Sequence, residues 1–134
     1  MNSNGGIKKF GYLPGGPKLP PGVEGIVINV RGMAGGAPLL QGHCRLSNEG
    51  ASLLKDSLLH NIAIVCTYGS SLRGVAFPLI QDEMVFEEDV QREQGFQQAF
   101  FNVALNTVGL PAGEGQYYIL ASFHTFLSEV IVFH

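Results

Sequence analysis

Short runs of alternating apolar and polar residues, separated by glycine, proline, asparagine and serine, follow one another along most of the chain. The runs are rich in β-branched and aromatic residues, which is typical of β-strands bounded by turns. Residues 113–134 show the pattern most completely, because a glycine-punctuated turn leads into a long strand, a polar corner and a last strand. The pattern predicts an all-β domain.

The runs upstream that are predicted to be strands are residues 23–31, 39–46, 62–68, 75–80, 84–90 and 96–106, with a turn at 91–95. In residues 39–46 an apolar side alternates with a polar side of Gln41, His43 and Arg45, as in a half-buried strand of an antiparallel sheet. Pro78 has no backbone N–H, so its run is predicted to be an edge strand or to contain a bulge.

Residues 47–61 allow two interpretations. Leucines and an alanine fit one side of a short helix that Ser47 or Asn48 would cap. The alternative is a loop followed by a strand that starts near Leu58.

Strands at near-regular spacing with turns between them predict a sandwich or a barrel, and we favour an antiparallel β-sandwich. The length of 134 residues is that of one domain, which we place at residues 23–134. Residues 1–22 are rich in glycine and proline and are expected to form a flexible arm outside the core. Its apolar residues Phe10, Tyr12 and Leu13 could anchor the arm to its own domain or to a neighbouring subunit.

The run Gly115-Gln116-Tyr117-Tyr118-Ile119-Leu120-Ala121, followed by a last strand, resembles the penultimate and final strands of immunoglobulin-like sandwiches. In that superfamily an Asp-x-Gly-x-Tyr-x-Cys run places a corner tyrosine whose hydroxyl bonds to the preceding loop. Gly115 and Tyr117 match, whereas Gly113 stands in place of the Asp and Ile119 in place of the Cys. The resemblance implies an immunoglobulin-like layout without the inter-sheet disulfide or the core tryptophan, and it implies no particular function.

Charged residues make up only 14% of the chain, against about 25% in typical domains. Either uncharged polar residues cover the surface, or part of it is buried against another chain, most simply in a homo-oligomer, and we favour the second. The net charge of −3 argues against a nucleic-acid partner. There is no apolar run long enough for a membrane span and no secretory signal, which favours the cytoplasm.

Six of the eleven acidic residues lie in residues 81–94. Carboxylates of this kind bind calcium, and Asp82, Glu87 and Asp89 are the candidate metal ligands, although their spacing is not that of an EF-hand. The alternatives are a solvated edge strand and a site for a basic partner. No other cofactor is expected.

Aromatic residues are predicted on both faces of the last strands, with Tyr117 and Phe123 on one face, Tyr118 on the other and Phe126 at the corner. Core packing explains one face, and a subunit interface would explain the other. A groove for a sugar or a peptide, with Tyr118 and Phe126 as the binding residues, is the alternative.

No catalytic motif is recognisable. Cys44 and Cys66 lie within predicted strands, where buried reduced thiols are expected rather than a disulfide or a nucleophile. His43 would point to the opposite side of its strand from Cys44, which disfavours a zinc site. We therefore expect a non-enzymatic binding or structural module that self-associates through an apolar sheet face. The alternatives are a carbohydrate- or calcium-linked ligand-binding domain and a small proteinaceous inhibitor, with a protein or glycan partner.

Overall fold

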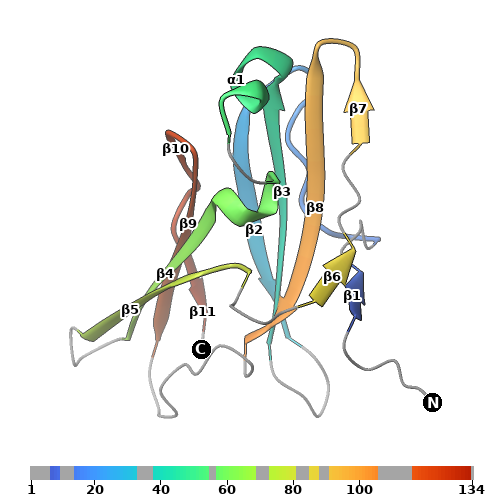
Figure 1. The fold of residues 1–134 in the computed structure, drawn as a ribbon. Coiled ribbons are helices and arrows are strands. Elements are labelled where there is room, and N and C mark those ends of the chain that lie inside the picture. The colour runs from blue at the N-terminus through green and yellow to red at the C-terminus, as the bar shows by residue number, and fades with distance from the viewer. Residues whose placement is uncertain are drawn as a thin grey trace.

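Two antiparallel β-sheets face each other in the computed structural model, which confirms the predicted all-β sandwich (Figure 1). The structure describes residues 7–9, 14–32, 38–54, 57–68, 73–80, 85–87, 91–105 and 116–133, and for residues 7–9, 68, 73, 85–87 and 133 it describes only the backbone. Within this part of the chain the helices are too short to cross a membrane.

The first sheet has the strand order β2-β3-β8-β7, and all its pairs are antiparallel. Its strands are β2 (Gly25–Arg31), β3 (Leu39–Ser47), β7 (Gln91–Glu93) and β8 (Phe96–Ala104). The second sheet has the order β10-β9-β4-β5, with β11 also paired to β9. Its strands are β4 (Ile62–Tyr68), β5 (Arg73–Pro78), β9 (Tyr117–Phe123), β10 (Phe126–Leu127) and β11 (Ile131–Phe133).

Three smaller elements complete the fold. The backbone of β1 (Ile7–Lys9) runs parallel to that of β6 (Val85–Glu87) in a two-stranded ribbon. The helix α1 (Asn48–Ser52) follows β3, and the 3-10 turn η2 (Leu59–Asn61) precedes β4.

Most predicted strands are confirmed, and the differences have local causes. Pro78 is the last residue of β5, which lies at the edge of its sheet as its missing N–H requires. The helical interpretation of residues 47–61 is confirmed in its first part, because the hydroxyl of Ser47 accepts a hydrogen bond from the N–H of Gly50 at 3.0 Å.

The turn predicted at residues 91–95 is wrong in its first half, since Gln91–Glu93 pairs with β8 as the exposed edge strand β7. The turn is confined to Gln94 and Gly95, and Gly95 takes a φ of 83°.

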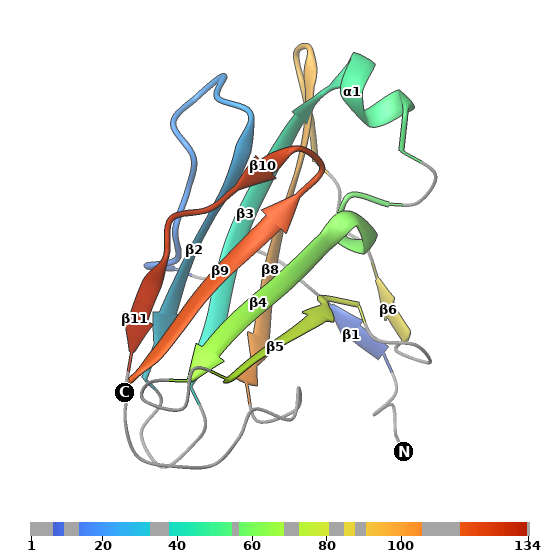
Figure 2. The ribbon, with the colours of Figure 1, turned by 90° about the vertical axis from the view of Figure 1, so that its left-hand side faces the viewer.

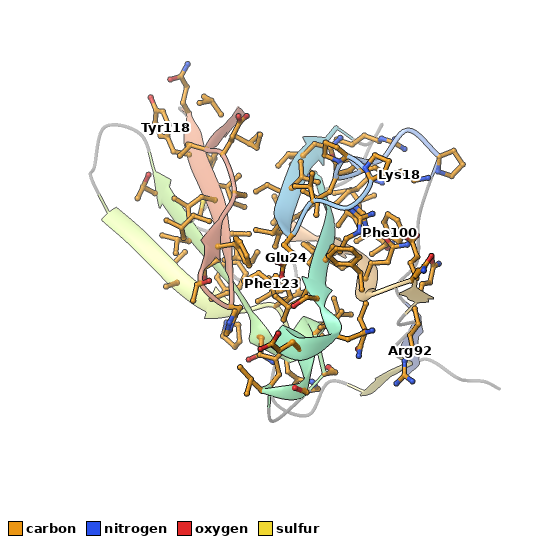
Figure 3. The ribbon with its side chains drawn as sticks, turned by 90° about the horizontal axis from the view of Figure 1, so that it is seen from above. Lys18, Glu24, Arg92, Phe100, Tyr118 and Phe123 are labelled. Atoms are coloured by element: carbon orange, nitrogen blue, oxygen red, sulfur yellow. The ribbon has the colours of Figure 1, made fainter. Side chains whose placement is uncertain are left out.

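The core lies between the two sheets and consists of apolar side chains that alternate along each inner face. In Figure 3, Phe123 points into this space while Tyr118 of the same strand points away from it. The largest side chains that are almost completely buried there include Leu40, Leu46, Ile62, Ile64, Phe101, Ile119 and Phe123.

Gly42 is the point at which the first sheet makes room for its largest core ring. It lies opposite Phe101 in the pairing of β3 with β8, and a Cβ built at Gly42 would overlap the ring of Phe101. Phe101 is itself buried, so the ring has no free space into which it could turn. A side chain at residue 42 would therefore overpack the core.

We expect Gly42→Ala to lower the free energy of unfolding by about 1–3 kcal/mol, because the added methyl overpacks the core. Urea denaturation measures this loss. Gly32→Ala is the matched control, since no described residue comes within 4 Å of a Cβ at Gly32, and it should leave stability within about 1 kcal/mol of the wild type. Equal stability of the two variants would contradict the assignment.

Candidate functional site

A row of polar side chains lies on the outer face of the first sheet, facing away from the core. His43 and Arg45 of β3 stand opposite Phe100 and Gln98 of β8. His43, Arg45 and Gln98 are only 1%, 4% and 5% exposed, so the solvent-facing side predicted for residues 39–46 is in fact buried. Polar groups as deeply buried as these are normally covered and hydrogen-bonded.

The cover is the segment 14–24, here called the strap, which crosses the outer face of the first sheet. Its backbone is held at the centre by two side chains of β3. Arg45 donates from Nη1 to the carbonyl oxygens of Pro20 at 2.7 Å and Val23 at 3.1 Å. The N–H of Leu19 donates to Nδ1 of His43 at 2.9 Å.

The two ends of the strap are tied as well. Arg31 donates from Nη2 to the carbonyl oxygen of Pro14 at 2.8 Å, and the N–H of Ser47 donates to Oε2 of Glu24 at 3.0 Å. Prolines at 14, 17, 20 and 21 lack a backbone N–H, so a regular ladder with a neighbouring strand is unavailable to the strap. Its carbonyl groups remain as acceptors, which suits a buried arginine. The flexibility of residues 1–22 stays a prediction, while the part from residue 14 onward lies against the sheet.

The amide of Gln98 joins the polar side chains into one network. Its Oε1 accepts from Nε2 of His43 and from Nη2 of Arg45, each at 2.8 Å. Its Nε2 donates to Oε1 of Glu93 at 2.6 Å and to Oε1 of Gln91 at 3.3 Å. Because an amide has one acceptor oxygen and one donor nitrogen, these four contacts fix its orientation.

The same network fixes the protonation of His43. Its Nδ1 accepts from a backbone N–H and therefore carries no proton, so the proton is on Nε2 and is donated to Gln98. Burial lowers the pKa of His43, and Arg45 and Lys18 lower it further, against the hydrogen bond to Gln98 and the charge of Glu93, which raise it. The ring stacks on Phe100 with the centroids 4.2 Å apart and the planes 10° from parallel. His43 is a neutral ring held on both nitrogens.

A pocket of about 620 Å³ lies between the strap and the sheet. Its walls include Lys18, Leu19, Arg45, Gln91, Glu93 and Phe100. In Figure 3, Lys18 and Phe100 lie together on the side of the first sheet that faces away from the core. The Nε of Arg45 is buried without a hydrogen-bond partner among the described residues. Because both nitrogens of His43 are engaged, this arrangement suits positioning and binding better than proton transfer.

The outer face of the second sheet has the opposite character. In Figure 2 this sheet faces the viewer, and no helix or strand of the described chain lies in front of β4 and β9. The strand register and the burial pattern place uncharged side chains at its described outer positions. These positions are Ala63, Val65, Thr67, Gly74, Ala76, Pro78, Tyr118, Leu120, Ser122, Leu127 and Val132.

Tyr118 and Phe126, the predicted ligand-binding residues, lie on different faces. Tyr118 is 39% exposed on the outer face of β9, where its hydroxyl donates to Oε1 of Gln116 at 3.0 Å. Phe126 pairs with the buried Phe123 and packs against the core beside Gly25. The structure therefore does not bring them together on one surface, and their role in binding stays a prediction.

The side chains of the three predicted metal ligands lie outside the part of the chain that the structure describes. Asp82 and Asp89 lie outside the described residues, as does the side chain of Glu87, whose backbone belongs to β6. Among the side chains that are described, no three His, Cys, Asp or Glu residues gather closely enough to hold a metal ion. The calcium site stays a prediction.

Both cysteines are buried thiols that form no disulfide, as the sequence predicted. Cys44 belongs to the inner face of β3, and Cys66 belongs to the inner face of β4 in the other sheet. Burial raises the pKa of the Cys66 thiol, which disfavours the reactive thiolate at neutral pH.

Comparison of the chain with protein-family models, with curated proteins and with solved structures finds no match.

The network of His43, Arg45, Gln98 and Glu93 was not anticipated from the sequence. Two signals for it are present in the chain. Three polar residues alternate within the β-rich run 39–46, and a proline-rich segment with free carbonyl groups precedes it. The partner residue Gln98 is more than fifty positions away, and only the register of β3 with β8 places it beside them.

We expect Gln98→Met to lower the free energy of unfolding by about 2–4 kcal/mol. Methionine has a similar volume but no acceptor, so buried donors of His43 and Arg45 lose their partner. Urea denaturation measures the loss. The control is Gln97→Met on the same strand, and we expect it to change stability by less than about 1 kcal/mol because no described network depends on Gln97. A neutral Gln98→Met would show that the network contributes little.

Proposed function

We propose that the protein is a non-enzymatic binding or structural module that associates with a second copy of itself through the outer face of β9, β4 and β5. The observation that carries the proposal is the lack of charge at the described outer positions of this face. A typical protein surface carries a charged residue at roughly one position in three or four. A sheet face whose described outer positions carry no charge is therefore unusual for a surface in contact with water.

The side chains of the face fit flat packing of one sheet on another. Tyr118, Val132 and Leu127 are 39%, 49% and 70% exposed, so a partner would remove a large apolar area from water. Small residues such as Gly74 and Ala76 on β5 leave room for the side chains of a facing sheet. Sheets that pack face to face lie about 10 Å apart, with their side chains interdigitated.

A second copy is the occupant that the charge pattern favours. In a twofold dimer the same patch faces itself, so an uncharged patch meets no like charge and leaves no charge unpaired. A charged partner would lose hydration on this face without gaining an ion pair. The opposite outer face of the sandwich is occupied by the strap, whose hydrogen bonds to Arg45 and His43 hold it in place.

We also propose that the sandwich is immunoglobulin-like in layout. The order β2-β3-β8-β7 corresponds to the order A-B-E-D of such domains. In the second sheet, β10 and β11 correspond to strand G, β9 to strand F and β4 to strand C, and β5 is an added strand beside β4. Cys44 lies on the strand that would hold the first cysteine of the inter-sheet pair, and Ile119 lies on the strand that would hold the second. This layout supports a binding or structural role only as an analogy.

We expect the wild type to have the native mass of a dimer, and Tyr118→Lys to raise the dissociation constant at least about 100-fold, because two buried ammonium groups would face each other without partners. Size-exclusion chromatography with light scattering and sedimentation equilibrium measure both. Leu53→Lys is the matched control, since Leu53 is 74% exposed next to α1 and outside this face. A wild type that stays monomeric up to about 100 μM, or a dimer that Tyr118→Lys leaves unchanged, would contradict the proposal.

A second candidate function is the binding of a small anion in the pocket beneath the strap, and the charge balance there favours it. The pocket lining holds two cationic side chains, Lys18 and Arg45, and one carboxylate, Glu93. The pocket volume of about 620 Å³ is within the usual range for sites of small molecules. A carboxylate or phosphate group would suit these two cations.

We expect inorganic phosphate and citrate, the two probes, to raise the melting temperature of the wild type, with the rise set by probe concentration over affinity. Lys18→Gln should reduce the rise. Arg92→Gln is the control, because Arg92 lies on β7 but outside the pocket lining, and it should keep the rise. The control separates site binding from general stabilisation by these salts, and equal rises in all three proteins would exclude the site.

A further inference from the structure

The middle of the strap is attached to the sheet through an imidazole nitrogen, which accepts a hydrogen bond only while it carries no proton. His43 accepts the N–H of Leu19 on Nδ1 at 2.9 Å, and this acceptor exists only while the ring is neutral. In other contacts of the strap with the sheet, Arg31 and Arg45 donate to backbone carbonyl oxygens, and the carboxylate of Glu24 accepts from a backbone N–H. The bond to His43 differs from these, because a proton on Nδ1 occupies the lone pair that accepts from Leu19.

Protonation of His43 would convert the acceptor into a donor. An N–H at Nδ1 would then point at the N–H of Leu19, and two donors repel each other. On the other side of the ring, Nε2 would keep its bond to Oε1 of Gln98. The new charge thus acts directly on the strap and leaves the sheet side of the ring bonded.

The charges that face His43 come from three elements. Arg45 of β3 and Lys18 of the strap are cations, and Glu93 of β7 is an anion that reaches the ring through Gln98. Phe100 of β8 stacks on the ring, and Val27 of β2 is its neighbour in the sheet; both are uncharged. An imidazolium in the closed arrangement would thus be almost completely buried beside two other cations.

We propose that residues 14–24 form a proton-operated latch on the outer face of the first sheet, closed while His43 is neutral and released when its ring takes up a proton. Release would uncover Phe100 and the polar network and would open the pocket. The latch is independent of the proposed self-association, because it does not involve the outer face of the second sheet. It shares the pocket beneath the strap with the second candidate function, but its test requires no ligand.

The direction of the pH dependence follows from linkage. In the closed form the pKa of His43 is lowered from 6.5, chiefly by burial, and in the open form the ring would return toward that ordinary value. The open form therefore binds the proton more tightly. Well above pH 6.5 the ratio of open to closed molecules is at its lowest and does not depend on pH. Below about pH 6.5 this ratio rises up to tenfold per pH unit until the closed form also protonates.

The experiment is a titration of the ¹⁵N-labelled full chain by NMR from about pH 8 to about pH 5, which spans the range in which an ordinary histidine titrates. At the upper end we expect an unprotonated Nδ1, a protonated Nε2 and a coupling through the hydrogen bond between Nδ1 of His43 and the amide nitrogen of Leu19. Below about pH 6.5 the coupling should vanish, and the amides of Lys18, Leu19 and Val23 should become mobile in step with the titration of His43. The amides of Ile119 and Phe123 in β9 report separately on the core.

Three outcomes of the wild-type titration would overturn the proposal. They are a proton on Nδ1 at neutral pH, strap amides that remain rigid after His43 has titrated, and loss of the strap only together with the core amides of β9. The last outcome would be acid unfolding of the whole domain rather than release of a latch.

His43→Asn tests the latch by removing the titrating group. The Oδ1 of asparagine can accept from the N–H of Leu19 at a similar position, and it does not titrate. We expect its strap amides to show no change in mobility across the titration. His124→Asn is the matched control at an exposed histidine, and it should keep the wild-type response. A strap that still opens with acid in His43→Asn would overturn the proposal, and the wild-type titration decides the question if this variant does not fold.

Discussion

The burial of Arg45 constrains the whole outer half of the first sheet. A guanidinium that is 4% exposed must have acceptors, and the strap supplies two carbonyl oxygens while Gln98 supplies a third. Gln98 in turn needs acceptors for its own N–H groups and finds them on β7. One buried cation therefore connects four parts of the chain: β3, β8, the edge strand β7 and the segment before β2. The position of each depends on the others, since an unpaired member would cost more than its bond contributes.

The two outer faces of the sandwich differ in their polarity and in whether a described segment covers them. The first face is polar, and its own N-terminal segment covers it with directed hydrogen bonds. The second face has no charge at the positions described, and nothing in the described chain covers it. Hydrogen bonds require exact geometry, which suits the strap because it belongs to the same molecule. Apolar contact tolerates a less exact fit, which suits association with a separate molecule. This division of roles underlies the proposal that the second face associates with a second copy.

The sequence allowed the strands and the core to be predicted because alternation is a local signal. Ile62–Tyr68 was located to the residue, and Tyr117 and Phe123 were correctly placed on the opposite face of β9 from Tyr118. The edge strand Gln91–Glu93 was missed, since its residues are polar on both faces and form a strand only by pairing with β8. The candidate site was missed for a related reason. His43 and Gln98 contact each other only through the register of two distant strands, and alternation alone does not show that a further segment covers their face.

The prolines of the strap have a consequence for the entropy of its docking. Pro14, Pro17, Pro20 and Pro21 restrict the conformations that the free segment can adopt, so less freedom is lost when it settles on the sheet. A few hydrogen bonds are then enough to hold it, and their sum need not be large. A segment that is held by a small surplus of free energy responds to the gain or loss of a single bond. The restricted conformations of the free strap, rather than strong bonds in the docked strap, would allow it to dock in one position and still be released readily.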